Sequence, residues 1–343
     1  MIKKIIKTTV FFAAVAVLAA AASVVVFQFY NKPPENGGTE QEVVFSVVPG
    51  DTVGNIAQKL YSENLIRSAA ALRIYSRVMG TGGSFKVGSY RIKYGEKMSE
   101  IHDILIEGRQ TLYRVTIPEG WTLRQIGALL EKEGITTASE FYKASSDKAL
   151  LSKYGIDAEN AEGFLFPDTY MFQKNFPAGR TVSFMIDNFY KNIKRIYPEY
   201  AAYSFKELYR KVILASIVER EYRIPEEAPL IAGVFYNRLK VGMSLGSCAT
   251  VAYIITDIEK KPHPSRITYQ DLEIQSPYNT YINKGLPPAP VSNPGKTALE
   301  AAFHPADTKY MFFVLEDPVT GRHKFTVTYQ DHLIAKNLYI KSK

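Results

Sequence analysis

A stretch of 23 residues without a single charge, 8–30, constrains the fold of this chain most strongly. About 20 apolar residues suffice for a helix to cross a bilayer, where the backbone has no other hydrogen-bond partners. Lys3, Lys4 and Lys7 precede the stretch, and a positive flank stays on the cytoplasmic side. We therefore predict a cytoplasmic tail over 1–7, a transmembrane helix over 8–30 and an extracytoplasmic remainder.

A cleaved signal peptide is the alternative, because residues 19–23 are small. Signal cores are usually about 7–15 residues long, shorter than this segment, so we favour an uncleaved anchor. The polar stretch 31–42, which begins NKPPENGGTEQ, reads as a linker rich in proline and glycine. The functional, extracytoplasmic part of the chain then begins near Glu42.

Charge and cysteine content limit the kinds of partner. The 343 residues carry a formal net charge of +8, but the basic residues are scattered and form no nucleic-acid-binding motif. We therefore expect no nucleic acid partner. The single cysteine, Cys248, excludes an internal disulfide. His304, His323 and His332 lie far apart without metal-ligand spacing, so we expect no metal and no cofactor.

Three segments share one pattern of a short β-like lead, a glycine and an amphipathic helix. They cover 47–60, 91–105 and 116–130 and align without gaps around their glycines. Each helix has a candidate N-cap and an Ile–Leu pair at i, i+4 spacing that predicts one core-facing side. The N-caps are Thr52, Lys97 and Thr122, and the core pairs are Ile56–Leu60, Ile101–Leu105 and Ile126–Leu130.

The first of these segments resembles a LysM module, a small βααβ unit that binds N-acetylglucosamine in peptidoglycan or chitin. The residues that carry the resemblance are PGDTVGNIA, followed by NLIRSAAALRIYSRVM. We predict a LysM-like domain over 43–113. Units of this kind also serve as scaffolding, so glycan binding and a purely structural role both stay open.

A glutamate interrupts an otherwise apolar run in LASIVEREY, 214–222. The pattern predicts one helix over 205–222, with Glu219 on the face that also carries Leu208, Val212, Ala215 and Tyr222. Glu221 lies about 200° further round the helix. Because the run is apolar on nearly every side, periodicity does not choose between the two glutamates. A buried carboxylate is costly unless it is paired, hydrogen-bonded or protonated.

Further motifs follow in a fixed order: EGFLFPDTYMF, LASIVERE, IAGVFYNRLKVGMSL, SPYNTYINKGLPPAPVSNPGKTALEAAFHPA, YMFFV and GRHKFTVTYQDH. Together they resemble the endolytic murein transglycosylases of the MltG (YceG-like) family, over essentially the whole chain. The resemblance implies an α+β protein with a membrane-anchor helix, the small LysM-like module and a mixed α+β catalytic domain over 114–343.

The resemblance also implies a function. It predicts a single-pass inner-membrane protein that cleaves MurNAc-β-1,4-GlcNAc bonds within nascent peptidoglycan glycan strands and leaves 1,6-anhydroMurNAc ends. This cleavage would end strand elongation, and cell-wall synthases would be partners. The family's catalytic glutamate corresponds to Glu219. A lytic transglycosylase needs one carboxyl group, because the sugar's own 6-hydroxyl attacks C1, and apolar surroundings keep such an acid protonated.

The substrate is polar with flat apolar sugar faces, so its site needs aromatic rings beside amides and hydroxyls. The residues we expect to bind it are Tyr278, Asn279, Thr280, Tyr281, Asn293, Asp168, Tyr170, Ser247 and Thr250. Loop architecture is the alternative role for the SPYNTY and SNPG residues. Glu221 either supports Glu219 or is a solvated charge at a helix end.

One segment departs from the family pattern, and two other functions stay open. Gly246, Cys248 and Ala249 stand where the resemblance leads us to expect Gln, Asp and Pro. Because a carboxylate is missing there, the protein could instead be a non-catalytic scaffold that binds peptidoglycan and positions wall synthases. A secreted hydrolase that uses two carboxylates, Glu219 with Asp168, is the third possibility.

Overall fold

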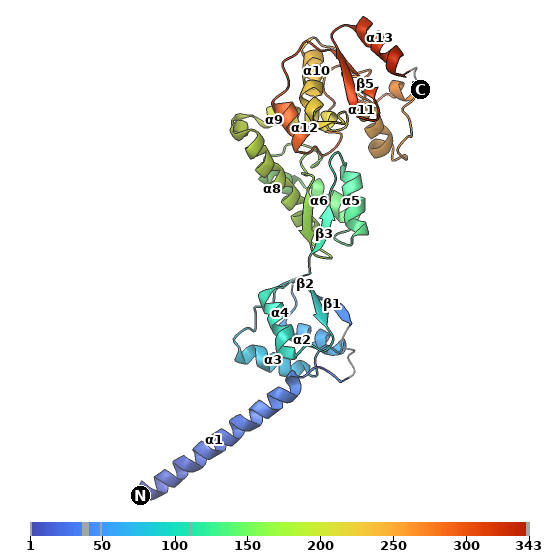
Figure 1. Cartoon of the computed structure of the whole chain (residues 1–343). Helices are drawn as coiled ribbons and strands as arrows, with labels where there is room; N and C mark the ends of the chain where they lie inside the picture. The colour runs from blue at the N-terminus through green and yellow to red at the C-terminus, as the bar shows by residue number, and fades with distance from the viewer. Residues whose placement is uncertain (1, 36–40, 49, 110, 341–343) are drawn as a thin grey trace. The chain divides into compact units, whose positions relative to one another are not determined.

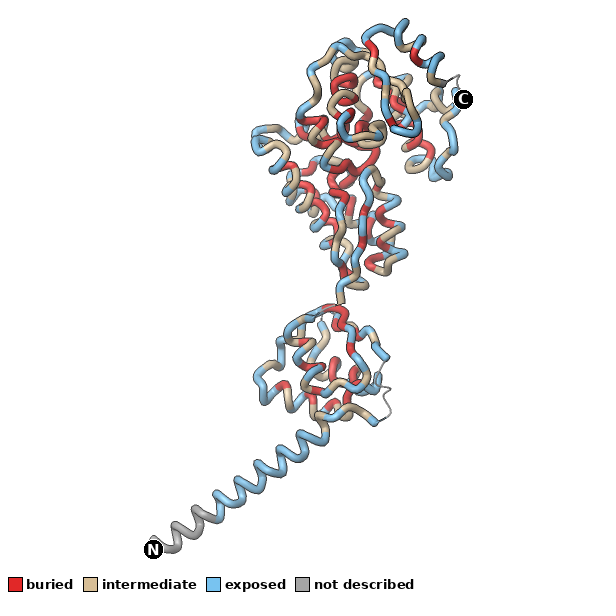
Figure 2. The backbone as a smooth tube through the Cα atoms, in the orientation of Figure 1, coloured by how far each residue is buried: buried red, intermediate tan, exposed pale blue. Residues whose placement is uncertain are grey.

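The computed structural model describes residues 2–35, 41–48, 50–109 and 111–340, and the side chains of 11–339 within these ranges. The chain forms two compact units, Met1–Tyr113 and Arg114–Lys343. Buried residues gather inside each unit, whereas residues 11–29 of the first helix are exposed (Figure 2). Each unit therefore has a core of its own.

Helix α1 (Ile2–Asn31) contains the predicted anchor (Figure 1). Its stretch Phe11–Asn31 is 21 residues long, with a mean hydropathy of 2.3 and no buried residue. Among the described residues it is the one helix long and apolar enough to cross a membrane. The helix already includes residues 2–7, which we expected to form a separate tail. Its length and composition fit a single-pass anchor and also a signal sequence.

The predicted linker over 31–42 is held to unit 1 at its start, and residues 36–40 lie outside the described residues. The Asn31 Oδ1 accepts a hydrogen bond from the Ser99 backbone N–H at 2.8 Å. The Arg67 Nε donates to the Pro33 carbonyl oxygen at 2.8 Å. These bonds tie the end of α1 to the globular part of unit 1.

Unit 1 surrounds a two-stranded sheet with three helices. Strands β1 (Glu42–Val47) and β2 (Gly88–Lys93) are antiparallel, and Phe45 lies opposite Tyr90. Helices α2 (Val53–Ser62) and α3 (Ala69–Val78) connect the strands, and α4 (Met98–Glu107) follows. The order β1–α2–α3–β2 is that of the predicted βααβ module. However, α4 contributes Ile101 and Leu105 to the same core, so the LysM resemblance stays a prediction.

The three strand–turn–helix segments form as predicted. They are β1–α2, β2–α4 and, in unit 2, β3 (Tyr113–Thr116) with α5 (Leu123–Lys132). Thr52 and Thr122 cap their helices by accepting the N–H groups of Asn55 and Gln125. All three predicted Ile–Leu pairs are buried. Lys97 lacks a side-chain cap of this kind, and the Glu100 carboxylate instead accepts the Lys97 N–H at 2.9 Å.

Unit 2 is mostly helical, with two small sheets. Strand β3 pairs with β4, and β5 forms an antiparallel hairpin with β6. After α5 the elements are α6 (Ala138–Ser145), α7 (Lys148–Lys153), β4 (Thr169–Phe172), α8 (Ala178–Ile196), α9 (Phe205–Val218), α10 (Ala228–Lys240), α11 (Cys248–Tyr253), α12 (Lys296–Phe303), β5 (Phe312–Asp317), β6 (Arg322–Thr326) and α13 (Tyr329–Ile340). Short 3-10 turns cover Pro198–Ala202, Pro225–Glu227 and Asp271–Glu273, and a π-helical turn covers Ile254–Ile258.

Helix α9 ends earlier than the sequence predicts. It runs from Phe205 to Val218, and Glu219 is its C-cap instead of a residue inside it. Beyond it, Glu221 and Tyr222 both donate their N–H groups to the Val218 carbonyl, which marks a turn. Pro225 lies a few residues on, and a proline disfavours helical geometry in the residue before it. Glu219 therefore lies at the carbonyl end of a buried helix.

The carboxyl end of α9 is fixed by the segment that precedes α12. Every α9 residue from Val212 to Val218 is buried, and α10 and α12 lie beside this helix (Figure 1). The Ser216 Oγ accepts the Val291 N–H at 3.0 Å, and the Ser292 Oγ donates to the Ser216 carbonyl at 2.9 Å. This packing places the segment 291–295 next to Glu219.

Candidate active site

The Glu219 carboxyl group is held by two hydrogen bonds. The Gly295 backbone N–H donates to its Oε2 at 2.9 Å, and the Tyr222 hydroxyl donates to its Oε1 at 3.3 Å. Gly295 is the residue before α12, and Tyr222 follows α9 in the turn. Both oxygens therefore have a partner, and the half-buried side chain has a defined direction.

A second carboxylate lies against the same glycine. The side chain of Glu119 covers Gly295 so closely that a Cβ at position 295 would overlap the Glu119 carboxylate. Its neighbour Gly120 has φ +72, and a Cβ there would lie 3.4 Å from the Glu219 Cγ. The Arg220 Nη1 donates to the Gly120 carbonyl at 3.3 Å. The turn between β3 and α5 thus packs directly on Glu219.

The pKa of Glu219 is raised to about 8, chiefly because burial disfavours the charged form. The nearby Glu119 charge raises it further, whereas the Gly295 and Tyr222 hydrogen bonds and the Arg220 charge lower it. The carbonyl end of α9 is the negative end of the helix dipole, which also disfavours a carboxylate there. At neutral pH Glu219 is therefore mainly protonated and able to donate a proton.

Asn293 joins this loop to the rest of unit 2. Its side chain is fully buried, and its Oδ1 accepts the N–H groups of Gly163 and Leu165, each at 2.9 Å. Its Nδ2 donates to the Trp121 carbonyl at 3.0 Å and to the Glu162 Oε1 at 2.7 Å. All the side-chain hydrogen-bonding groups of Asn293 thus contact protein. The geometry favours a positioning role for Asn293 in place of the direct substrate contact we expected.

Glu162 is a buried carboxyl group that the sequence did not single out. It is 3% exposed and accepts the Leu123 N–H at the start of α5. Burial raises its pKa to about 8. Its partners are a helix N-terminus and a buried amide, so Glu162 supports the segment that carries Glu119 and Gly120.

Glu221 belongs to a separate hydrogen-bond network. The Ser247 Oγ donates to the Glu221 Oε1, and the Ser247 N–H donates to the Thr280 Oγ1 at 3.0 Å. The hydroxyl oxygens of Thr280 and Thr250 are 2.9 Å apart. Burial raises the pKa of Glu221. The structure thus brings together four residues of the predicted set, and Glu221 anchors α11 instead of contacting Glu219.

The SPYNTY motif divides into buried amides and hydroxyls and half-buried tyrosines. Asn279 is fully buried and donates to the Leu272 and Ile274 carbonyls, each at 2.9 Å. This favours loop architecture for Asn279, and Thr280 is buried with it. Tyr278 and Tyr281 are half-buried. The tyrosines therefore keep open ring surface, while the polar residues between them hold the loop.

The predicted pair Asp168 and Tyr170 lies at the β3–β4 sheet. Asp168 is exposed, and the Asn188 Nδ2 donates to its Oδ2 at 2.8 Å and to the Tyr170 hydroxyl at 3.2 Å. The Tyr170 hydroxyl in turn donates to the Phe166 carbonyl at 2.5 Å. These contacts join β4 to α8. The carboxylate whose charge acts on Glu219 is Glu119 and not Asp168.

The segment with Gly246, Cys248 and Ala249 departs from the family pattern, and its backbone conformation accounts for the glycine. Gly246 has φ +58, in the left-handed region where a glutamine would be strained. Cys248 is exposed, and its Sγ lies 3.0 Å from the Tyr281 hydroxyl. Burial raises the pKa of the Cys248 thiol, so the group at this position is uncharged where an aspartate would carry a charge.

Sequence reasoning missed Glu119, Glu162, Tyr222 and Gly295. One signal for Glu119 was present, because the residue before the repeat's glycine is Pro49 in the first copy and Tyr94 in the second. An acid at this turn position distinguishes the third copy. Tyr222 was placed on the face of Glu219 but was given no role. Glu162 and Gly295 become visible only when segments far apart in the sequence come together.

The chain is similar to several known proteins. A curated protein of Bacillus subtilis named endolytic murein transglycosylase is 31% identical over 88% of this chain and 86% of its own length. A protein of the same name from Streptococcus pneumoniae is 28% identical, and the match covers 58% of that longer protein. A crystal structure of a yceG-like protein from Listeria monocytogenes has a TM-score of 0.56 at 27% identity, covering 86% of this chain and 99% of that one. The profile of the YceG-like family matches residues 45–337, and the chain therefore belongs to this family.

Proposed function

We propose that this protein is an endolytic murein transglycosylase, a lyase that cleaves MurNAc-β-1,4-GlcNAc bonds within peptidoglycan strands. The relatives that carry this name match nearly the whole chain. The observation that carries the proposal is Glu219, a largely desolvated carboxyl group with a pKa of about 8 at the end of α9. An acid that is protonated at neutral pH is what this cleavage requires.

Glu219 performs both proton transfers in the proposed reaction. Its protonated carboxyl group donates a proton to the glycosidic oxygen as the bond from C1 of MurNAc breaks. The resulting carboxylate then accepts the proton of the C6 hydroxyl as that oxygen bonds to C1. The products are a strand ending in 1,6-anhydroMurNAc and a strand beginning with GlcNAc. No water is consumed, and Glu219 returns to its protonated form.

The hydrogen bonds around Glu219 suit this cycle. Gly295 N–H and the Tyr222 hydroxyl can stabilise the carboxylate that exists between the two transfers. Burial keeps the resting group protonated, and the negative charge of Glu119 adds to this effect. The site thus contains one group that exchanges protons, and the neighbours of this group set its pKa.

We infer that sugar rings stack on the half-buried tyrosines of the SPYNTY loop. Tyr278 and Tyr253 have ring centroids 5.2 Å apart, and Tyr281 is held by Cys248. Aromatic faces of this kind suit the apolar faces of sugars. In this proposal the buried polar residues form the framework of the site, namely Ser247, Thr250, Asn279, Thr280 and Asn293. Glu221 anchors the start of α11 through Ser247.

We also propose that α1 is retained as an inner-membrane anchor with its N-terminus in the cytoplasm. The support is its length, its lack of buried residues and the lysines at its start. The globular part then faces the periplasmic side, where peptidoglycan is made. Cell-wall synthases are proposed partners on the same ground, because cleavage of a nascent strand ends its elongation.

The products of full-length protein in detergent, mixed with purified peptidoglycan in heavy-oxygen water, test the reaction. A transglycosylase gives anhydro ends without heavy oxygen. A hydrolase that uses Glu219 and Asp168 gives reducing ends that carry heavy oxygen and would overturn the proposal. Binding to peptidoglycan without any cleavage would leave the scaffold function in its place.

A further inference from the structure

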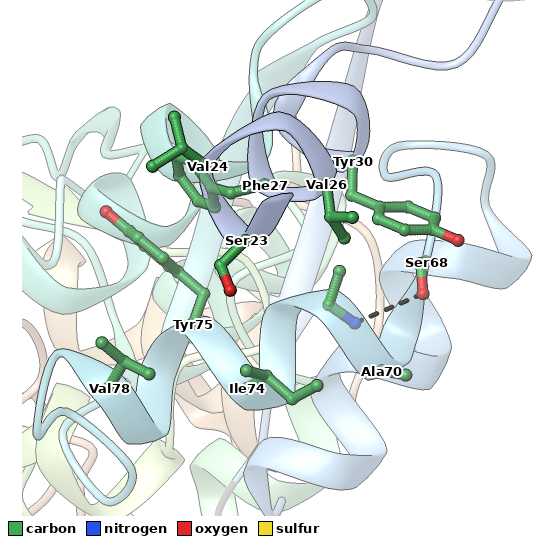
Figure 3. Close-up of a pocket in the computed structure, with 11 residues that line it drawn as sticks. Ser23, Val24, Val26, Phe27, Tyr30, Ser68, Ala70, Ile74, Tyr75 and Val78 are labelled. Atoms are coloured by element: carbon green, nitrogen blue, oxygen red, sulfur yellow. Dashed lines mark hydrogen bonds between the residues drawn. The ribbon is translucent and has the colours of Figure 1, made fainter. Parts of the chain in front are cut away.

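An apolar groove runs along the junction of α1 and α3 in unit 1. Its volume is about 600 Å³, and Figure 3 shows side chains from both helices lining it. The main lining residues are Val24, Phe27 and Tyr30 from α1 and Ile74, Tyr75 and Val78 from α3. The groove is thus walled on one side by the anchor helix itself.

The two helices are fixed to each other near this groove. The rings of Phe27 and Tyr75 stack with centroids 5.3 Å apart. The Arg67 guanidinium lies 5.1 Å from the centre of the Phe29 ring, and Asn31 is bound to Ser99. Because these contacts span the last turns of α1, α3 is held beside the outer end of the anchor.

The length of the anchor places α3 at the membrane boundary. The stretch Phe11–Asn31 has 21 residues, which at 1.5 Å per residue extend about 30 Å, the thickness of a hydrocarbon core. The α1 wall of the groove, 23–30, is the outer third of this stretch. If α1 spans the bilayer, the side chains of α3 that face this wall lie at the level of the headgroups and upper acyl chains.

The composition of α3 suits that position. Ala70, Ile74 and Val78 form a stripe at i, i+4 and i+8, and Ile74 and Val78 are 63% and 78% exposed. The helix also carries the exposed arginines Arg73 and Arg77 and no acidic residue. An apolar stripe beside basic side chains is typical of helices that lie in a membrane interface. Arginine side chains can reach from such a depth to lipid phosphates.

We propose that the groove between α1 and α3 binds a phospholipid acyl chain, and that α3 lies in the outer boundary of the bilayer. The occupant follows from continuity, because the groove extends the lipid-facing surface of the anchor. Arg73 and Arg77 contact headgroup phosphates. The proposal rests on the membrane-spanning role proposed for α1. The proposal goes beyond anchoring, because contact between α3 and the lipids would hold unit 1 against the membrane surface.

Quenching by lipids with brominated acyl chains tests the groove. The full chain is reconstituted in phosphatidylcholine–phosphatidylglycerol vesicles with one added tryptophan, and the quenching of native Trp121 is measured separately and subtracted. Ile74→Trp and Val78→Trp report on the groove. Val17→Trp reports on the middle of α1. Val44→Trp is the matched control, since it is 45% exposed on β1, which Figure 1 draws apart from the end of α1.

The proposal predicts loss of emission at positions 74 and 78, strongest with bromines near the headgroup, and no loss at position 44. Loss at position 17 without loss at 74 and 78, at every protein-to-lipid ratio, would overturn the groove proposal while leaving the anchor intact. Loss at 74 and 78 only at high dilution would indicate a second copy as occupant at high density, and would also count against a resident lipid. If position 17 keeps its emission, the anchor itself is wrong. Circular dichroism of each variant confirms that it is folded.

Discussion

The first and third strand–turn–helix segments are built alike but use an acidic side chain in opposite ways. In the first, Asp51 accepts the Val48 N–H at 3.0 Å and pairs with Lys59 at 2.8 Å, which lowers its pKa. In the third, Glu119 packs over Gly295 and acts on Glu219. The same local fold is therefore self-contained in unit 1, while in unit 2 its charge is directed at another carboxyl group.

The difference follows from three positions of the repeat, where Pro49, Asp51 and Lys59 of the first copy correspond to Glu119, Trp121 and Leu129 of the third. Lys59 in α2 stands where α5 has Leu129, so the third helix has no cation at this position. The acidic residue directly follows the glycine in the first copy, as Asp51, and directly precedes it in the third, as Glu119. The Glu119 side chain is therefore directed away from its own helix. Differences at two turn positions and one helix position thus accompany the different use of the acid in the two copies.

Replacing Glu219 with glutamine should have the largest effect on activity. Glutamine keeps the size of the side chain and can accept the Gly295 N–H, but it cannot exchange a proton. General acid–base catalysis typically contributes about 10²–10⁴-fold, and here one group acts twice, so the yield of anhydro ends should fall by at least the upper value. Chromatography of muropeptides measures this yield.

Glu221→Gln is the matched control for Glu219→Gln. The Glu221 side chain binds Ser247 and lies in the network under α11, so its replacement should cost much less yield. Thermal unfolding of both variants shows whether the fold is intact. If Glu221→Gln removes the anhydro ends while Glu219→Gln retains them, the catalytic residue has been assigned wrongly.

Asn293→Ala should destabilise unit 2 and reduce activity together. The change removes a buried amide that joins Gly163, Leu165, Trp121 and Glu162. A buried group left without its partner costs about 1–3 kcal/mol, and several are affected here, so the midpoint in a urea titration should fall clearly. Asn283→Ala is the control, because that residue is exposed and its two side-chain hydrogen bonds go only to the Ser276 and Asn279 carbonyls of its own loop. Equal midpoints for the two variants would refute the role of Asn293.

Glu119→Gln should shift the pH dependence of cleavage and leave the fold nearly unchanged. Without the neighbouring charge the pKa of Glu219 falls, so Glu219 loses its proton at a lower pH. The alkaline limb of the activity profile should therefore move to lower pH, while the melting temperature stays close to that of the wild type. An unchanged limb would show that Glu119 does not act on the catalytic acid.

Lys59→Met should have the smallest effect. Lys59 is 42% exposed at the side chain but Asp51 only 8%, so loss of the pair should cost about 1 kcal/mol, the upper end for exposed pairs. We expect a slightly lower stability of unit 1 and no change in the pH profile of cleavage. A shift in that profile would contradict the view that the turn of the first segment is self-contained.

Features set by neighbouring residues were predictable from the sequence. Thr52 and Thr122 act within four residues of themselves, so the starts of α2 and α5 could be predicted, as could the Ile–Leu pairs that face the cores. The end of α9 was predicted too late, because periodicity continues past Val218 while the backbone turns. Local patterns report where a helix can continue but not where tertiary contacts end it.

The candidate site was predictable at its central residue and less so around it. A carboxyl group in an apolar run needed an explanation, but periodicity did not choose between Glu219 and Glu221, and the family resemblance supplied that choice. Asn279 and Thr280 were expected to bind substrate, with loop architecture as the alternative, and both are buried, because composition shows that a side chain is polar and not which way it points. Glu119 and Gly295 come from segments far from Glu219 in the sequence. Their meeting depends on the packing of α9, α12 and the β3–α5 turn.

The most direct test is to measure the pKa of Glu219 and the pH dependence of cleavage in the same protein. A proton-binding titration of the wild type minus that of Glu219→Gln gives the pKa of this carboxyl group. Our account predicts a value of about 8, with formation of anhydro ends falling as the pH rises through the same value, because the protonated form is then lost. An ordinary carboxyl pKa of about 4.3, or activity that stays constant through pH 8, would contradict it.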